Sequence, residues 1–278
     1  MRKPSPIRST ILGTALLVAA AVPAMAGIHY QATTRTETPQ ARGSEVRVEG
    51  WAAGDKAKVE FKEATNGNPF TQKGTYILSK DGGKTLYLVN PAEKTYAVWD
   101  LRGMLGAAGA VMNGIGPLLK VQFSEPQVEK LAEDDGGTLL GLPIRHYKYR
   151  TSYTMTMRVL GRANVNDVVT EQDFWTTTKL GDAGLSVWLR SEPPRTGNVE
   201  LDKLLTADRY KMQGFPLKTV TVSTSTDKKK GRTNTTRTSM EVTQLDASAA
   251  VPASAFEIPS GYKETQILPA AREGVKDQ

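Results

Sequence analysis

The chain has 278 residues, of which 39% are hydrophobic and 23% are charged, and its 36 Lys and Arg against 29 Asp and Glu give a net charge of +7. It contains no cysteine, which excludes disulfides, thiolate metal sites, a cysteine nucleophile and lipidation at an N-terminal cysteine. A chain of this length buries enough apolar surface to fold without such cross-links.

The first 26 residues follow the order of a secretory signal peptide. Three basic residues precede an apolar run and a small-x-small cleavage site: Arg2, Lys3 and Arg8, then Ile11 to Val22, then Ala24 to Ala26. The apolar run is shorter than the ~18 residues that a membrane-spanning helix needs, which argues against an anchor. We expect cleavage near Ala26, export to the periplasm or the exterior, and a soluble mature chain.

Alternation of apolar and polar residues, which is typical of half-buried strands, begins soon after the signal peptide. It occurs at Tyr30 to Thr36, Val46 to Val48 and Ala57 to Phe61. Three further stretches are apolar on both faces, which predicts strands covered on both sides: Tyr76 to Leu78, Leu86 to Val89 and Tyr96 to Trp99. The segments that join these three, 81–83 and 90–93, hold turn-forming residues and predict hairpins.

The segment from Leu101 to Ile115 interrupts the strands with apolar residues at helical spacing. They are Leu101, Met104, Leu105, Ala108, Val111, Met112 and Ile115. Four glycines lie among the other positions, and each costs roughly 0.5–1 kcal/mol in a helix, so this helix needs its apolar stripe buried. The residues leave open whether the stripe packs permanently as core or shares the interior with an apolar guest.

The longest alternation runs from Ile144 to Val159. Its odd positions are mostly apolar: Tyr147, Tyr149, Thr151, Tyr153, Met155, Met157 and Val159. Its even positions are polar: His146, Lys148, Arg150, Ser152, Thr154, Thr156 and Arg158. This pattern predicts one strand with an apolar face and a solvated face.

Three further strands are predicted near the C-terminus, at Val165 to Thr178, Phe215 to Ser225 and Thr235 to Leu245, the last two joined by a turn across 227–232. A short helix is predicted between them, with Asn198 as its N-cap. From about Thr265 to Gln278 the chain is polar and without period, which predicts a flexible tail. The domain prediction is therefore a signal peptide over 1–26, a single β domain over 27–264 and a tail over 265–278.

No catalytic or metal-binding pattern is present in the sequence. His29 and His146 fall on the polar sides of separate strands, which favours a solvent-facing position over zinc ligation. Two acidic groups are expected in turns or beside strand ends, as surface carboxylates: Glu133 to Asp135, and Asp167 with Glu171 and Asp173. No serine lies in a G-x-S-x-G motif. We expect a protein that is not an enzyme and that has no metal and no cofactor.

Lys228, Lys229, Lys230 and Arg232 form a basic run between two predicted strands. A membrane surface or a nucleic acid attracts such a run, but no aromatic residue alternates with the charges. A charged hairpin tip is the favoured interpretation, and we expect no nucleic-acid partner.

Three segments resemble exported proteins of the LolA/LolB-like lipoprotein-carrier superfamily, especially members of unknown function. They are 84–91 with 94–96 (KTLYLVNP and KTY), 214–218 (GFPLK) and 256–262 (FEIPSGY). Together with the strand order, the resemblance spans nearly the whole mature chain. It implies a mainly β fold with a few helices: a strongly curved antiparallel sheet, or incomplete barrel, whose concave apolar face is covered by a helical lid.

In that superfamily the cavity accepts acyl chains or similar apolar groups. The resemblance implies that Leu101 to Ile115 is the lid and that five side chains line the concave face: Tyr147, Tyr149, Tyr153, Met155 and Met157. The leading functional hypothesis is a non-catalytic carrier for a lipid, an acyl chain or a lipid-modified protein, with transient membrane contact. The alternative is an envelope structural or interaction module whose core is filled. The oligomeric state is not readable from the sequence.

Overall fold

The computed structural model describes residues 24–39, 41–65, 71–83, 85–99, 119–180, 199, 202–204, 206, 211 and 213–265. Thirteen strands in this part of the chain join one sheet. They are β1 (Ala24–Thr38), β2 (Ala41–Ala53), β3 (Lys56–Ala64), β4 (Tyr76–Ser79), β5 (Leu86–Asn90), β6 (Thr95–Trp99), β7 (Leu119–Phe123), β8 (Gln127–Leu139), β9 (Leu142–Val159), β10 (Arg162–Thr177), β11 (Phe215–Asp227), β12 (Thr233–Pro252) and β13 (Lys263–Glu264). A 3-10 helix, η3 (Ala253–Phe256), follows β12.

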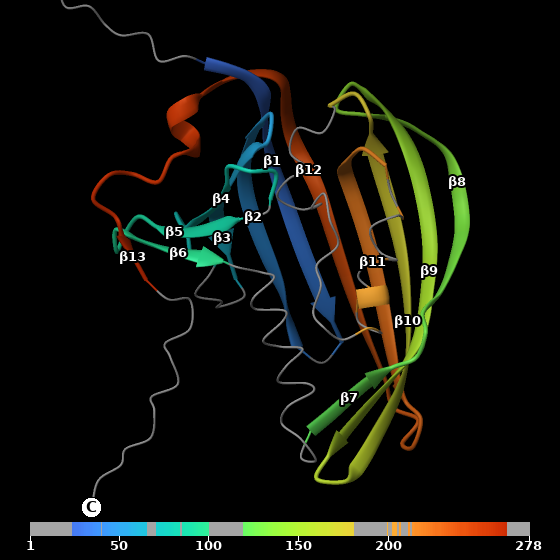
Figure 1. Ribbon diagram of the computed structural model, residues 1–278. Helices are drawn as coiled ribbons and strands as arrows, with labels where there is room; N and C mark the ends of the chain where they lie inside the picture. Colours follow the sequence, from blue (N-terminus) through green and yellow to red (C-terminus); the bar gives the residue numbers. More distant parts are fainter. Residues whose placement is uncertain are drawn as a thin grey trace, which may run out of the picture.

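The strand order is β13-β6-β5-β4-β3-β2-β1-β12-β11-β10-β9-β7, and β8 pairs with β9 beside β7. Every pairing is antiparallel except that of β13 with β6. Figure 1 shows a curved, open sheet that runs from β5 and β6 on one side, through β1 and β12, to β8 and β9 on the other. The prediction of a mainly β protein with a curved antiparallel sheet is therefore confirmed.

Local sequence explains the hairpins that connect neighbouring strands. β8 turns into β9 through Leu140 and Gly141, and β9 turns into β10 through Leu160 and Gly161. All four residues have positive φ, between 48° and 78°, which is the signature of the two-residue type I′ turn. The basic run is also a turn, in which Asp227 Oδ1 accepts the backbone N–H groups of Lys229 and Lys230 at 2.9 Å.

The largest buried cluster gathers side chains from β1, β2, β3, β9, β11 and β12 and from the turn after β10: Ile28, Tyr30, Ala32, Ala52, Ala57, Ile144, Leu180, Phe215, Leu217 and Val242. A second cluster lies where η3 and the chain after it cover β4 and β5. There Phe256 packs with Leu78 and Val89, and each of the three is at most 1% exposed. Burial in this second cluster raises the pKa of Tyr76 to about 12.

The structure extends most of the predicted strands and corrects others. All four residues of β4 are buried, as expected, but Val98 of β6 is 38% exposed, so β6 is not covered on both sides. The prediction that Glu133 to Asp135 lie in a turn or beside a strand end was wrong, because they lie within β8. The second acidic group, from Asp167 to Asp173, lies well inside β10. β7, β8 and β13 were not predicted.

Several predicted elements fall outside the described residues. They are the signal peptide up to Pro23, the helix from Leu101 to Ile115 with all its proposed lid residues, Asn198, and the tail after Thr265. Residues 199, 202–204 and 206 are helical. β1 begins at Ala24, and its first three residues, Ala24 to Ala26, pair with residues 250–252 of β12. Cleavage after Ala26, as predicted from the sequence, would remove these three residues from the strand. No helix in the described part of the chain has the length and hydropathy of a membrane span.

Candidate functional site: the tyrosine face of the sheet

The odd-numbered residues of β9 share one face of the sheet, which we call the tyrosine face. It carries the five predicted site residues Tyr147, Tyr149, Tyr153, Met155 and Met157. The register places Tyr147 opposite Phe174 and Tyr153 opposite Val168 on β10. On the other side, Met155 lies opposite Phe123 of β7. Directly opposite residues of paired strands point to the same side, so this face continues onto β10 and β7.

The tyrosine face is buried at one end and half-buried at the other. Tyr147, Tyr149 and Phe174 form a cluster in which each is 7–8% exposed. Tyr153, Met155 and Met157 are half-buried, and the ring of Tyr153 lies 6.1 Å from that of Phe123. The structure therefore brings all five predicted residues to one face, and their contact with a ligand stays a prediction.

Sequence reasoning missed Lys211, a buried cation on this face. Lys211 is 1% exposed, and its Nζ donates to Thr151 Oγ1 at 2.6 Å and to Gln172 Oε1 at 2.5 Å. Thr151 and Gln172 lie on the paired strands β9 and β10, where Thr151 is directly opposite Thr170 and Gln172 directly opposite Tyr149. The sequence contains one indication of a polar contact on this face. Thr151 carries a hydroxyl group and stands between Tyr149 and Tyr153 in the odd-numbered series of β9.

The even-numbered residues of β9 from His146 onward lie on the opposite side, which we call the charged face. There His146 contacts two carboxylates, with Nδ1 3.1 Å from Asp134 Oδ1 and Nε2 2.9 Å from Asp173 Oδ1. Its ring stacks on Trp175 at a centroid distance of 4.7 Å. His146 thus joins β8, β9 and β10, and its side chain, 15% exposed, is more enclosed than the sequence suggested.

His29 has a parallel arrangement on β1. Its Nε2 lies 2.8 Å from Glu49 Oε1, and its ring stacks on Trp51 at 5.3 Å. Burial of Glu49 raises the pKa of its carboxyl, but the hydrogen bonds from Lys62 and His29 outweigh burial and hold that pKa below its usual value. Both histidines therefore hold strands together through carboxylate contacts. Among the described residues, no group of three or more His, Asp or Glu side chains is arranged so that it could hold a metal ion.

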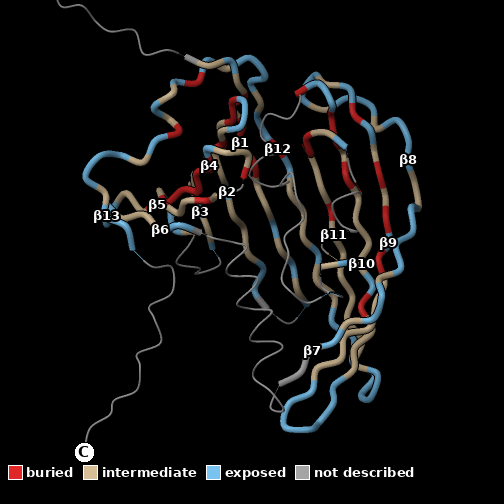
Figure 2. The backbone as a smooth tube through the Cα atoms, in the orientation of Figure 1, coloured by how far each residue is buried: buried red, intermediate tan, exposed pale blue. Residues whose placement is uncertain are grey.

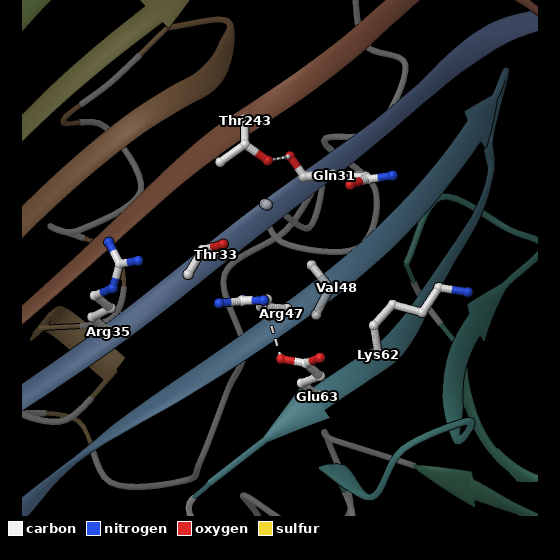
Figure 3. Close-up of a pocket in the computed structure, with 9 residues that line it drawn as sticks. Gln31, Thr33, Arg35, Arg47, Val48, Lys62, Glu63 and Thr243 are labelled. Atoms are coloured by element: carbon white, nitrogen blue, oxygen red, sulfur yellow. Dashed lines mark hydrogen bonds and ion pairs between the residues drawn. The ribbon is translucent and has the colours of Figure 1, made fainter.

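A hollow of about 480 Å³ lies between β12, β1, β2 and β3 (Figure 3). Bulges flank it: the β1–β12 register shifts between Gln31 and Ala32, and the β2–β3 register shifts between Arg47 and Val48. Its polar walls include Arg35, Arg47, Lys62, Glu63, Thr33 and Thr243. Arg47 pairs with Glu63 at 3.2 Å across it. This hollow is polar, unlike the apolar cavity that the resemblance implies.

Comparison with known proteins gives one family match and no match to a curated protein. Residues 161–262, from the β9–β10 turn through η3, match a domain of unknown function, DUF4412. Among solved structures, the chain is similar to a LolA superfamily protein from Nitrosomonas europaea, with 12% identity, a TM-score of 0.31, and coverage of 83% of this chain and 90% of that one.

Two other solved structures are also similar to the chain. An uncharacterized conserved protein from Thermus thermophilus has 12% identity and a TM-score of 0.33, with 86% of this chain and 90% of that one covered. Lipovitellin has 6% identity and a TM-score of 0.25, with 81% of this chain and 26% of that one covered. A LolA superfamily protein is therefore among the solved structures to which the chain is similar.

Proposed function

We propose that the protein is a non-catalytic, exported carrier that holds a lipid, an acyl chain or a lipid-modified protein against its tyrosine face. The observation that carries this proposal is the uneven burial of that face. Tyr153, Met155 and Met157 form, with Phe123, an apolar area that is only half-buried. Methionine suits such an area because its side chain is flexible and polarizable and adapts to ligands of different shape.

The chain between β10 and β11 supports the proposal by its position. Lys211 lies on the tyrosine face beside Thr151, and Lys203, in the short helical segment, pairs with Glu125 just after β7 at 3.2 Å. We propose that this segment and the predicted lid enclose the ligand from the side away from the sheet. The lid residues in this proposal are Leu101, Met104, Leu105, Ala108, Val111 and Met112. Residues 27–264 act as one domain in it, with 265–278 as a tail.

Lipid analysis and fluorescent fatty-acid titration test the proposal. Gently purified mature protein should yield a stoichiometric apolar molecule in mass spectrometry of an organic extract. Met155→Gln and Met157→Gln should each weaken fatty-acid binding about fivefold, because each places an amide where an apolar chain has to lie. Thr156→Gln is the matched control on the charged face of the same strand, and it should bind as the wild type does.

The alternative is a structural or interaction module whose core is filled by the protein itself. The large cluster around Tyr30, Phe215 and Leu217 favours it, because that part of the sheet is packed with its own side chains. This alternative expects no extracted lipid and no fatty-acid uptake, together with specific cross-links to partner proteins. That combination would rule out the carrier.

A further inference from the structure

Two hairpin tips lie together at one end of the sheet: the β9–β10 tip and the β11–β12 tip (Figure 1). They are neighbours because β10 pairs with β11, with Asn166 opposite Asp227. The backbone N–H of Lys228 also donates to the carbonyl of Val165 at 2.9 Å. Both tips are exposed in Figure 2. The fold thus brings two segments that are far apart in the sequence to one exposed end.

The β9–β10 tip presents apolar side chains to solvent. Leu160 is 71% exposed, and Val159 beside it is 46% exposed. Leu160 also has a φ of 48°, in the left-handed region that favours Gly, Asn or Asp at this turn position. Leu140 has a similar φ, 51°, in the β8–β9 turn but is less exposed, at 45%, so the backbone conformation alone assigns no role. What sets Leu160 apart is its greater exposure beside a second exposed apolar residue, Val159.

Basic residues surround these apolar side chains. Arg158 and Arg162 flank the first tip, and the second tip carries Lys228, Lys229, Lys230 and Arg232, all of them exposed. Two described carboxylates near the tips have partners already. Asp167 pairs with Lys228 at 3.1 Å, and Asp227 caps its own turn. The six basic and two acidic residues named give this end of the sheet a net formal charge of +4 (6 − 2), next to the exposed side chains of Leu160 and Val159.

We propose that this end of the sheet docks on an anionic lipid bilayer. Leu160 and Val159 enter the interfacial region, and the surrounding cations contact lipid phosphates, a pairing of forces that holds peripheral proteins on membranes. A nucleic acid fits less well, because the tips carry no aromatic side chain on which bases stack. The inference goes beyond the proposed function, since it requires no ligand on the tyrosine face.

Vesicle sedimentation tests the docking. The mature protein should bind vesicles of equal parts phosphatidylglycerol and phosphatidylcholine and should not bind phosphatidylcholine alone. Binding should weaken when the salt concentration rises from about 0.05 to 0.5 M, because screening shortens the reach of the charges. Lys228→Gln, Lys229→Gln and Lys230→Gln together should weaken binding at least roughly tenfold.

Leu160→Asn tests the apolar point without endangering the fold, because asparagine is favoured in this turn. It should weaken vesicle binding about fivefold, as expected from the loss of one inserted leucine. The matched control is Leu140→Asn, which changes the same kind of turn at the opposite end of β9, where Leu140 is 45% exposed and has a φ of 51°. This control should bind vesicles as the wild type does.

Three results would overturn the docking proposal: equal binding by the Leu160→Asn and Leu140→Asn variants, undiminished binding by the triple glutamine variant, or binding to duplex DNA but not to vesicles. Fatty-acid uptake by Leu160→Asn separates the two proposals. Unchanged fatty-acid uptake together with weakened vesicle binding supports the docking surface, independently of whether the carrier proposal is correct. If uptake falls in step with vesicle binding, the tip acts through the ligand site and the independent docking surface is wrong.

Discussion

Lys211 Nζ lies 2.6 Å from the hydroxyl of Thr151, on the face of β9 that carries Tyr147, Tyr149, Tyr153 and the two methionines. Both residues are at most 3% exposed. A buried ammonium group needs hydrogen-bond acceptors in place of water, and Thr151 and Gln172 supply two of them. The polar pair thus positions the chain between β10 and β11 against the tyrosine face.

Thr151→Val should lower the free energy of unfolding by about 1–3 kcal/mol, because it keeps the shape of the side chain and removes an acceptor from a buried charge. Urea denaturation followed by circular dichroism measures the change. The control is Thr156→Val on the charged face of the same strand, which should stay within about 0.5 kcal/mol of the wild type. Equal losses in the two variants would contradict this role for Thr151.

Gly50→Ala should destabilise the protein by about 1–3 kcal/mol through overpacking. Gly50 lies directly opposite Tyr30, and a Cβ atom at position 50 would overlap the ring of Tyr30. The ring cannot move away freely, because it is 4% exposed and packs edge-on against Phe215 at 5.5 Å. Thermal unfolding of Gly50→Ala in the wild-type and Tyr30→Leu backgrounds measures the coupling. In the Tyr30→Leu background, Gly50→Ala should lower the free energy of unfolding by less than half as much as in the wild type. An equal loss in both backgrounds would show that the added Cβ does not clash with the Tyr30 ring.

Glu49→Gln should lower the free energy of unfolding near neutral pH by about 0.5–1 kcal/mol. The reason is that the substitution removes the carboxylate that contacts His29 and Lys62. The folded-state pKa of Glu49 is lowered, so its contribution is present above the ordinary value of 4.5 and is lost as the pH falls through the folded pKa. The difference between variant and wild type should therefore shrink in denaturant titrations as the pH falls below 4.5. Glu63→Gln, at a side chain 60% exposed, should have little effect at either pH. A difference that grows on acidification would contradict the prediction.

Leu160→Asn and Leu140→Asn should each raise the free energy of unfolding by about 0.5–1 kcal/mol, because asparagine tolerates positive φ and exposes no large apolar surface. Chemical denaturation of both variants measures the gain. A loss at position 160 alone would show that Leu160 makes a stabilising contact within the protein, which would remove the reason to assign it to a membrane.

The long strands of this fold were predictable from the sequence because a period of two is a local property. β9 is the clearest case: its alternation alone assigned Tyr149 to one face and Arg150 to the other. β8 has no such pattern. It is an edge strand, largely exposed in Figure 2, and its acidic residues resemble those of a loop. Backbone pairing with β9 holds it in place, together with contacts such as that of Asp134 with His146.

The residues of the candidate site also fall into those that a local sequence pattern predicts and those that it does not. The tyrosines and methionines of β9 were found because they belong to a single strand, and the resemblance only gave them a role. Lys211 was not found because its partners, Thr151 and Gln172, lie 60 and 39 residues away in the sequence. Of the two hairpin tips, the sequence predicted the basic one, as a charged turn. The position of Leu160 beside it follows only from the pairing of β10 with β11.

The pairing of β1 with β12 sets the order of events when the chain folds. These strands lie far apart in the sequence and side by side in the middle of the sheet. As the chain emerges from its N-terminus onward, β1 to β6 and β9 to β11 can each form as successive antiparallel neighbours, but these two parts of the sheet remain unjoined until β12 is available. In that interval β1 and β11 each expose an open edge, and such edges favour intermolecular association. Joining strands so distant in sequence is also slow, so these open edges persist until the last long strand pairs with both of them.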